Sequence, residues 1–361
     1  METDVLIVGG GLAGLTLADH LTRAGIEFLL VEAQSRLGGR ILTEQLSGGQ
    51  FDLGPAWFWP GQPRMADLVQ RFSLPVFEQY SSGDLMFQDQ TGTVQRGRGY
   101  ASMQGSLRLD GGLGQLISAL GDTIDQNSVF LDTRLVSLSR EAGYLAAGLE
   151  RSGTPFRVRA KQVVLAIPPR VAAETIAVEP RLEPEQIGAL KQIPTWMAGQ
   201  AKILAVYDQP YWRNAGLSGD ALSQRGPMVE IHDASPKQGG PYALFGFVGV
   251  PADARAGQGA TLLGLAKTQL AAMFGKEMAK PIDLVIKDWA SVPGIATTED
   301  RAPVRNHPIY GLPSQLRAIW DGKLHLASTE TAQGFGGFLE GALEAAERTA
   351  HDLARPVSSA A

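Results

Sequence analysis

The first forty residues follow a strand, glycine turn, helix and strand order that restricts the fold more than any other feature of the chain. The apolar run at residues 5–8 leads into Gly-Gly-Gly-Leu-Ala-Gly at residues 9–14, a G-x-G-x-x-G pattern. A helical pattern covers residues 12–23, and a second apolar run at residues 28–31 ends in Glu32. A β-α-β unit with an acidic residue about 20 positions after its glycines is typical of dinucleotide binding.

Each glycine of this pattern has a separate physical role. Gly9 permits the tight turn out of the strand, Gly11 lets a pyrophosphate approach the backbone, and Gly14 lets the helix pack close to the sheet. The helix N-terminus offers free N–H groups and a positive dipole end to phosphate. Glu32 can accept hydrogen bonds from ribose hydroxyls, and its charge disfavours a 2′-phosphate. A glycine turn in an ordinary α/β protein is the alternative.

Composition narrows the class of protein. The chain has 361 residues and a net charge of −5, which argues against general binding to nucleic acid or to anionic membranes. No apolar run approaches the roughly 18 residues of a membrane-spanning helix, and the N-terminus has no leader pattern, so we expect a cytoplasmic protein. The absence of cysteine excludes disulfides and thiolate chemistry, and the five histidines lack metal-ligand spacing. We therefore expect no metal, and read the histidines as surface or packing residues.

Five segments in order along the chain carry a resemblance to a known family. They are the E-A-Q-S-R-L-G-G-R element at residues 32–40, the D-L-G loop at 51–57, the glycine turn and helix at 109–116, the lysine-bearing strand at 201–213, and the C-terminal segment at 326–342. Together they resemble the flavin-containing amine oxidases of the monoamine and polyamine oxidase type. The resemblance implies FAD rather than NAD.

The resemblance implies an α/β fold with a Rossmann-type dinucleotide-binding domain and a smaller, sheet-containing substrate domain inserted into it. The expected FAD-binding domain is discontinuous and comprises residues 1–75, 107–190 and 295–355. The expected substrate domain comprises residues 76–106 and 191–294, and residues 356–361 are expected to form a flexible tail.

The cofactor contacts that the pattern and the resemblance imply come from every part of this domain. Arg40, and less distinctly Arg36, can offset phosphate charge, with solvated side chains as the alternative. The 54–56 loop suits close passage along the flavin, although a plain turn is the alternative. The implied set is Gly9, Gly11, Leu12, Ala13, Gly14, Glu32, Ala33, Arg36, Gly39, Arg40, Gly54, Pro55, Ala56, Trp57, Leu135, Trp289, Thr329, Glu330, Phe338 and Leu339.

Lys202 is the residue expected to take part in the chemistry. It lies in the middle of an apolar strand pattern, where an ammonium group is costly without a partner. By resemblance it is the lysine that holds a water at flavin N5 and assists reoxidation by oxygen. A strand lysine that reaches solvent is the alternative.

The substrate side departs from the family pattern. Phe338 matches one of two aromatic rings that often frame the amine, but Ala296 stands where the second ring is expected. Ile295 stands where some members carry a flavin-linking cysteine, so we expect noncovalent FAD. Residues 76–106 are shorter than the helical insertion that usually roofs the cavity, which leaves open what covers it. The pocket residues expected from the sequence are Trp57, Trp196, Phe335 and Phe338.

These features favour an FAD-dependent amine oxidase that acts on a small neutral amine. Hydride would pass from the amine α-carbon to flavin N5, giving an imine that water hydrolyses, and O2 would be reduced to H2O2. An FAD-dependent desaturase or dehydrogenase acting on a C–C or ring C–N bond with another acceptor is the alternative. A flavin-bearing interaction module with little turnover is a third possibility, while the exact substrate and the oligomeric state stay open.

Overall fold

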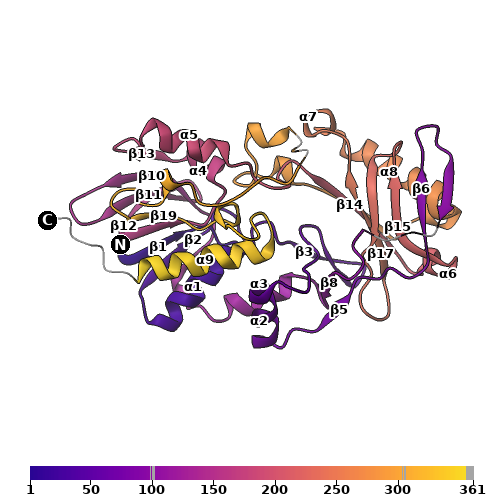
Figure 1. Ribbon diagram of the computed structural model, residues 1–361, viewed down its shortest axis with the longest axis horizontal. Helices are drawn as coiled ribbons and strands as arrows, with labels where there is room; N and C mark the ends of the chain where they lie inside the picture. The colour runs from indigo at the N-terminus through magenta and orange to yellow at the C-terminus, as the bar shows by residue number, and fades with distance from the viewer. Residues whose placement is uncertain (98, 100–101, 303, 305, 355–361) are drawn as a thin grey trace.

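The computed structural model describes residues 1–97, 99, 102–302, 304 and 306–354. The tail expected at 356–361 lies outside the described residues. The structure has two large sheets, one at each end of an elongated molecule, with the N-terminus and the last described helix, Leu339–Leu353, beside the first sheet (Figure 1). None of the described helices is long and apolar enough to cross a membrane.

The first sheet has a parallel centre flanked by an antiparallel meander. Its spatial order is β13 (Ala177–Glu179), β10 (Thr133–Arg140), β11 (Leu145–Arg151), β12 (Thr154–Leu165), β1 (Glu2–Val8), β2 (Phe28–Val31) and β9 (Val129–Phe130), and β19 (Leu324–Leu326) also pairs with β12. Strands β12, β1, β2 and β9 are parallel, as are β12 and β19. Their carboxyl ends therefore meet at one edge, where ligands bind in such sheets.

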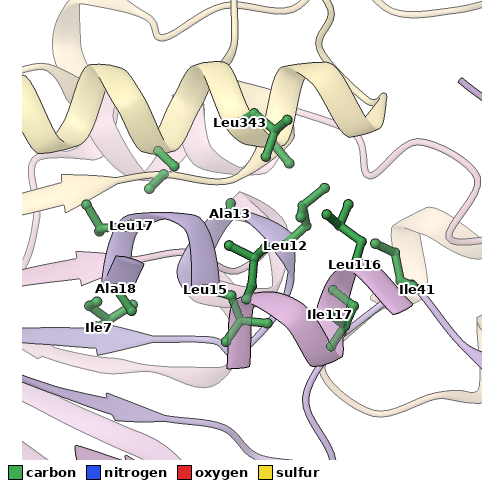
Figure 2. Packing of buried hydrophobic residues seen from close by; sticks show 14 of the residues in the cluster. Ile7, Leu12, Ala13, Leu15, Leu17, Ala18, Ile41, Leu116, Ile117 and Leu343 are labelled. Carbon is green, nitrogen blue, oxygen red and sulfur yellow. The ribbon is translucent and has the colours of Figure 1, made fainter. Parts of the chain in front are cut away.

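Alternation along β1 explains why helices cover both faces of this sheet. Val5 and Ile7 pack into the cluster with α1 (Leu12–Ala24), α3 (Gly114–Gly121) and α9 (Leu339–Leu353), which Figure 2 shows from close by. Leu6 and Val8 point to the opposite cluster, which contains residues of α4 (Pro169–Thr175) and α5 (Pro184–Gln192). A strand with two apolar faces is typical of a buried parallel sheet.

The second sheet is formed by a different set of strands. Its order is β18 (Asp283–Asp288), β14 (Ala201–Tyr207), β17 (Tyr242–Val248), β16 (Met228–Asp233), β15 (Leu217–Ser223), β6 (Asp84–Gln88) and β7 (Val94–Gly97). On β14, Ile203 packs into the cluster with helix α8 (Gly259–Phe274), whereas Leu204 packs into the cluster with Phe51 and Phe245. The face of β14 that carries Leu204 is therefore the face turned toward the first part of the chain.

Smaller elements connect the two sheets. The hairpin of β3 (Thr43–Leu46) and β4 (Gly49–Asp52) and the pair of β5 (Val76–Glu78) and β8 (Leu107–Leu109) lie between them (Figure 1). The other elements are helices α2 (Pro63–Arg71), α6 (Tyr211–Asn214) and α7 (Ala252–Arg255), with short 3-10 turns at Gln126–Ser128, Lys276–Ala279, Trp289–Ser291, Thr298–Arg301, Ser314–Leu316 and Thr329–Thr331.

Candidate functional site

The glycine turn after β1 has the shape that phosphate binding needs. A Cβ on Gly14 would lie 1.9 Å from the Gly9 carbonyl oxygen, so only glycine permits this contact between helix and strand. Gly9 has a φ of 107°, a backbone conformation that favours glycine. A Cβ on Gly11, in contrast, would meet no heavy atom nearer than 3.9 Å. Gly11 therefore packs against the Gly38–Gly39 backbone without crowding.

The first turn of α1 supplies backbone hydrogen-bond donors directly after this glycine turn. The Leu15 N–H donates to the Gly11 carbonyl at 2.9 Å, which starts the helical hydrogen-bond pattern. The N–H groups of Leu12, Ala13 and Gly14 therefore have no acceptor within the helix. With the positive end of the helix dipole, they form an anion site.

Glu32 is buried at the carboxyl end of β2, next to this turn. Its Oε2 accepts the Gly10 N–H at 2.7 Å, and its Oε1 accepts the Gln34 N–H at 2.8 Å. Burial raises the pKa of Glu32, although these backbone donors oppose the shift. Each oxygen keeps a lone pair for a ligand hydroxyl. The neighbouring residue, Ala33, is exposed. Leu135 lies on β10, and this strand begins next to Glu32, where the Thr133 N–H donates to the Glu32 carbonyl at 2.8 Å.

Arg36 forms hydrogen bonds to the backbone of the loop at residues 37–41. Its guanidinium donates to the carbonyls of Leu37, Gly39 and Ile41 at 3.1, 2.7 and 3.0 Å. These bonds shape the loop that brings Gly38 and Gly39 against the first glycine turn, where the Gly38 N–H donates to the Gly10 carbonyl at 2.8 Å. Arg36 is thus not simply solvated, and its visible role is to hold the loop.

Arg40 and Glu330 form an ion pair that joins the N-terminal and C-terminal parts of the chain. Arg40 Nη1 lies 2.6 Å from Glu330 Oε1, and the Glu330 side chain is fully buried. The Glu330 carboxylate raises the pKa of Arg40 even though burial opposes that shift. The other oxygen, Oε2, is buried with no hydrogen-bond partner among the described residues. A buried, unsatisfied carboxylate oxygen is costly, and a hydroxyl-bearing ligand would satisfy it.

Lys202 lies on β14 with its amine turned toward the loop after β4. Lys202 Nζ donates to the Gly54 carbonyl at 2.6 Å and to the Asp52 carbonyl at 3.1 Å. The residue is 3 % exposed, so it does not reach solvent as the alternative interpretation required. Burial lowers the pKa of Lys202 to about 7, against the opposing charge of Asp52. The Phe245 ring, whose centroid lies 4.0 Å from Nζ, offsets part of the cost of burial.

The 54–56 loop packs closely against protein backbone at its first residue, while its expected passage along the flavin stays a prediction. A Cβ on Gly54 would lie 1.9 Å from the Arg40 carbonyl oxygen and 3.4 Å from the Trp289 ring. Trp289 is buried and its Nε1 donates to the Leu53 carbonyl at 3.1 Å. Trp289 thus contacts the start of this loop through both its ring and its indole N–H.

The start of α9 is held next to the segment that carries Glu330. The Thr329 hydroxyl donates to the Phe338 carbonyl at 2.7 Å, and Phe338 caps the helix that begins at Leu339. The Phe335 carbonyl accepts the Phe338 N–H at 3.1 Å, and a Cβ on Gly341 would lie 2.1 Å from that oxygen. The free N–H groups of this helix end favour negative charge on a bound ligand.

The four pocket residues expected from the sequence do not form one group. Trp57 contacts the rings of Phe245 and His232, at 5.2 and 5.0 Å between centroids, on the Lys202 side. Phe338 contacts Trp59 and His307, at 6.1 and 5.0 Å. Trp196 joins the Phe338 group through His307, at 4.7 Å. Phe335 contributes the backbone contact described above.

The sequence interpretation missed His232. Rather than being a simple packing residue, it is 1 % exposed, with Nδ1 bonded to Asp220 at 2.7 Å and Nε2 to Glu230 at 2.9 Å. Burial would lower the pKa of His232, but the two carboxylates outweigh it and raise the pKa. The E-x-H spacing of Glu230 and His232 on β16 was the only available signal, because Asp220 comes from another strand. The buried ring supports Trp57.

The site as a whole fits FAD. The glycine turn, the free N–H groups at the start of α1 and the buried Glu32 suit a pyrophosphate and a ribose. The unsatisfied Glu330 oxygen and the start of α9 suit the middle and the flavin end of the cofactor. The sequence contains no cysteine, so a cysteinyl link to the flavin is impossible.

Family models match both parts of the chain. Residues 91–354 match the model for flavin containing amine oxidoreductase, and residues 7–72 match that for an NAD(P)-binding Rossmann-like domain.

Several known proteins are similar over most of the chain. A protein of Mycobacterium tuberculosis named as a flavin-containing monoamine oxidase is 28 % identical, over 97 % of this chain and 96 % of its own length. That alignment spans 456 positions, more than the 361 residues of this chain, so the relative carries insertions. An L-amino acid dehydrogenase of Synechocystis is 23 % identical, over 96 % of this chain and 94 % of its own length.

Solved structures share the architecture. A variant of putrescine oxidase superposes with a TM-score of 0.80 at 18 % identity, covering 98 % of this chain and 99 % of that one. Cyclohexylamine oxidase from Brevibacterium oxydans gives a TM-score of 0.79 at 18 % identity, with the same coverage. These likenesses show the fold, in which a Rossmann-type domain is combined with a second, sheet-containing domain.

Proposed function

Since this chain belongs to the flavin-containing amine oxidoreductase family, we propose that it is an FAD-dependent amine oxidase that acts on a small amine in its neutral form. When bound, FAD would supply the two-electron redox chemistry that converts the amine to an imine and O2 to H2O2. The imine would be hydrolysed by water. The glycine turn, Glu32, Arg40 and Glu330 would hold the cofactor.

The burial of Lys202 and its two hydrogen bonds to backbone carbonyls are the main support for this proposal. A protonated lysine has three donors, and two of them are used by the carbonyls of Asp52 and Gly54. The third donor can hold a water beside the loop along which the flavin is expected to lie. A pKa of about 7 keeps both protonation states accessible near neutral pH. Lys202 would hold that water while oxygen accepts the electrons.

The other residues would bind and orient. Phe338 would form one wall of the amine pocket because its ring is partly exposed beside the start of α9. An amine that enters neutral needs no protein base, so the substrate side can consist largely of apolar rings.

The proposal is tested by separating reduction of the flavin from its reoxidation. The purified yellow holoenzyme is mixed anaerobically with a panel of amines, and loss of oxidised-flavin absorbance is followed before oxygen is admitted. Lys202→Met is expected to slow reoxidation much more than reduction. Lys287→Met is the matched control, because Lys287 lies opposite Lys202 on β18 but contacts the Trp289 ring. Equal slowing of both steps by Lys202→Met would contradict the assigned role.

A dehydrogenase or desaturase that uses another acceptor is the second candidate. It is favoured by Ala296, which leaves the expected aromatic frame incomplete, and by the dehydrogenase among the relatives. Peroxide formation in air separates the two, since only the oxidase yields a stoichiometric amount with each turnover. Rapid reduction without peroxide would favour the dehydrogenase.

A further inference from the structure

Phe338 has no aromatic partner at the position where the family pattern expects one. Ala296 is half-buried and packs with Ala198, Trp289 and Ile295. Phe338 itself is 36 % exposed, so part of its ring is free of other protein contacts. A different segment of the chain contacts its ring instead.

That segment brings His307 onto Phe338. The two rings are stacked, with centroids 5.0 Å apart and planes inclined by 21°. His307 also meets Trp196 at 4.7 Å and Tyr310 at 5.5 Å, both edge-on. Three aromatic rings therefore hold an imidazole that is itself exposed at the outer edge of the group.

Tyr310, three residues after His307, is held by contacts of its own that place this segment beside Phe338. The Tyr310 hydroxyl donates to the Pro194 carbonyl at 2.8 Å. Its side chain fills the hollow above two glycines, since a Cβ on Gly336 would lie 2.3 Å from Tyr310 Cβ and one on Gly337 would lie 3.2 Å from Tyr310 Cε2. The glycines directly before Phe338 thus let this segment approach.

The same group is connected to the expected cofactor site. Arg40 Nη1, which pairs with Glu330, also donates to the Trp196 carbonyl at 3.4 Å. The rings therefore share a support with the residues expected to hold FAD.

We propose that His307 supplies the second ring of the amine-facing wall and, by stacking directly on Phe338, excludes flat aromatic groups from the space between two rings. The proposal rests on the amine oxidase function proposed above. A centroid separation of 5.0 Å is direct ring contact, which leaves no slot for a substrate. Aliphatic amines, which bind by apolar burial beside the wall, are the substrate class that this arrangement favours over benzylamine-like amines.

The test compares hexylamine with benzylamine in three variants of the holoenzyme. His307→Ala opens the slot and should lower KM for benzylamine relative to hexylamine about three- to tenfold, the value of one added ring contact. His307→Phe keeps the stack and should retain the wild-type ratio. His351→Ala, in the last turn of α9, is the exposed control. An unchanged ratio in His307→Ala, or the same shift in His307→Phe, would overturn the proposal.

A second measurement does not depend on turnover. Ring currents from Phe338 and Trp196 should displace the Cε1–H proton resonance of His307 in histidine-labelled protein, and Phe338→Leu should remove most of that displacement. Absence of the displacement would refute the stacked wall even in an active oxidase. A normal displacement in a protein that no amine reduces would instead refute the amine oxidase function.

Discussion

Replacing Lys202 with Met should change how the stability of the protein depends on pH. Burial lowers the pKa of Lys202 from 10.5 to about 7 in the folded protein. Between these values the unfolded chain binds a proton that the folded chain does not, so wild-type stability rises with pH across this window. Methionine has a similar length, fills the space and does not titrate.

The magnitude follows from the size of the shift. Each pH unit within the window is worth about 1.4 kcal/mol at most, so moving from about pH 7.5 to about pH 9.5 gives roughly 2.5 kcal/mol. An unfolding entropy of about 2.1 cal/mol/K per residue makes this a change of about 3 °C in Tm for a chain of this size. The bonds lost to the Asp52 and Gly54 carbonyls add an offset that depends little on pH in this window.

The assay is thermal unfolding of the holoenzyme followed by flavin fluorescence at several pH values. The Tm of Lys202→Met minus that of the wild type should be most positive near pH 7.5 and should fall by about 3 °C at pH 9.5. Lys267→Met, exposed on α8, should show no such trend. A Tm difference that does not vary with pH would refute the argument that burial holds the amine near neutrality.

Three further predictions concern the cofactor site and the second sheet. Gly11→Ala should leave the Tm of the cofactor-free protein within about 1 °C of wild type but abolish FAD uptake, whereas Gly14→Ala should destabilise the fold itself by several degrees, as calorimetry on both would show. Glu330→Gln leaves the Arg40 guanidinium with a weaker partner and should lower FAD affinity at least tenfold, measured by reconstitution; unchanged affinity would exclude a cofactor role for this carboxylate. His232→Gln should cost more stability at pH 6 than at pH 9, because the raised pKa of His232 gives stabilisation that is complete below about pH 6.5 and lost as pH rises through the folded-state pKa; a larger cost at high pH would contradict the charged pairing.

Much of the fold could be predicted where the pattern is local. The residue pattern predicts helices at 12–23, 115–120, 183–193, 260–275 and 340–353, and the ends of α1, α3, α5, α8 and α9 lie within one residue of these ranges. The pattern also predicts two separate strands near 156–160 and 163–167, but the structure has one strand there, β12, which pairs along one side first with β11 and then with β19. β15 and β16 were not predicted, because Gly219, Asp220 and Glu230 interrupt their apolar pattern.

The candidate site divides in the same way. The glycine turn and Glu32 could be recognised because the residues that must approach one another are close in sequence. The Arg40–Glu330 pair, the carbonyl partners of Lys202 and the stacking of His307 on Phe338 join segments that lie far apart along the chain. Nothing in the spacing of these residues indicates which of them meet.

The sequence alone determined the β-α-β unit, the flavin-binding family and the lysine, because backbone geometry and short-range contacts impose recognisable residues at set intervals. The tertiary structure decided which carbonyls offset the cost of burying that lysine, and which ring stacks on Phe338. Those outcomes depend on burial and ring contact between distant segments, and such contacts exist only once the two sheets have assembled.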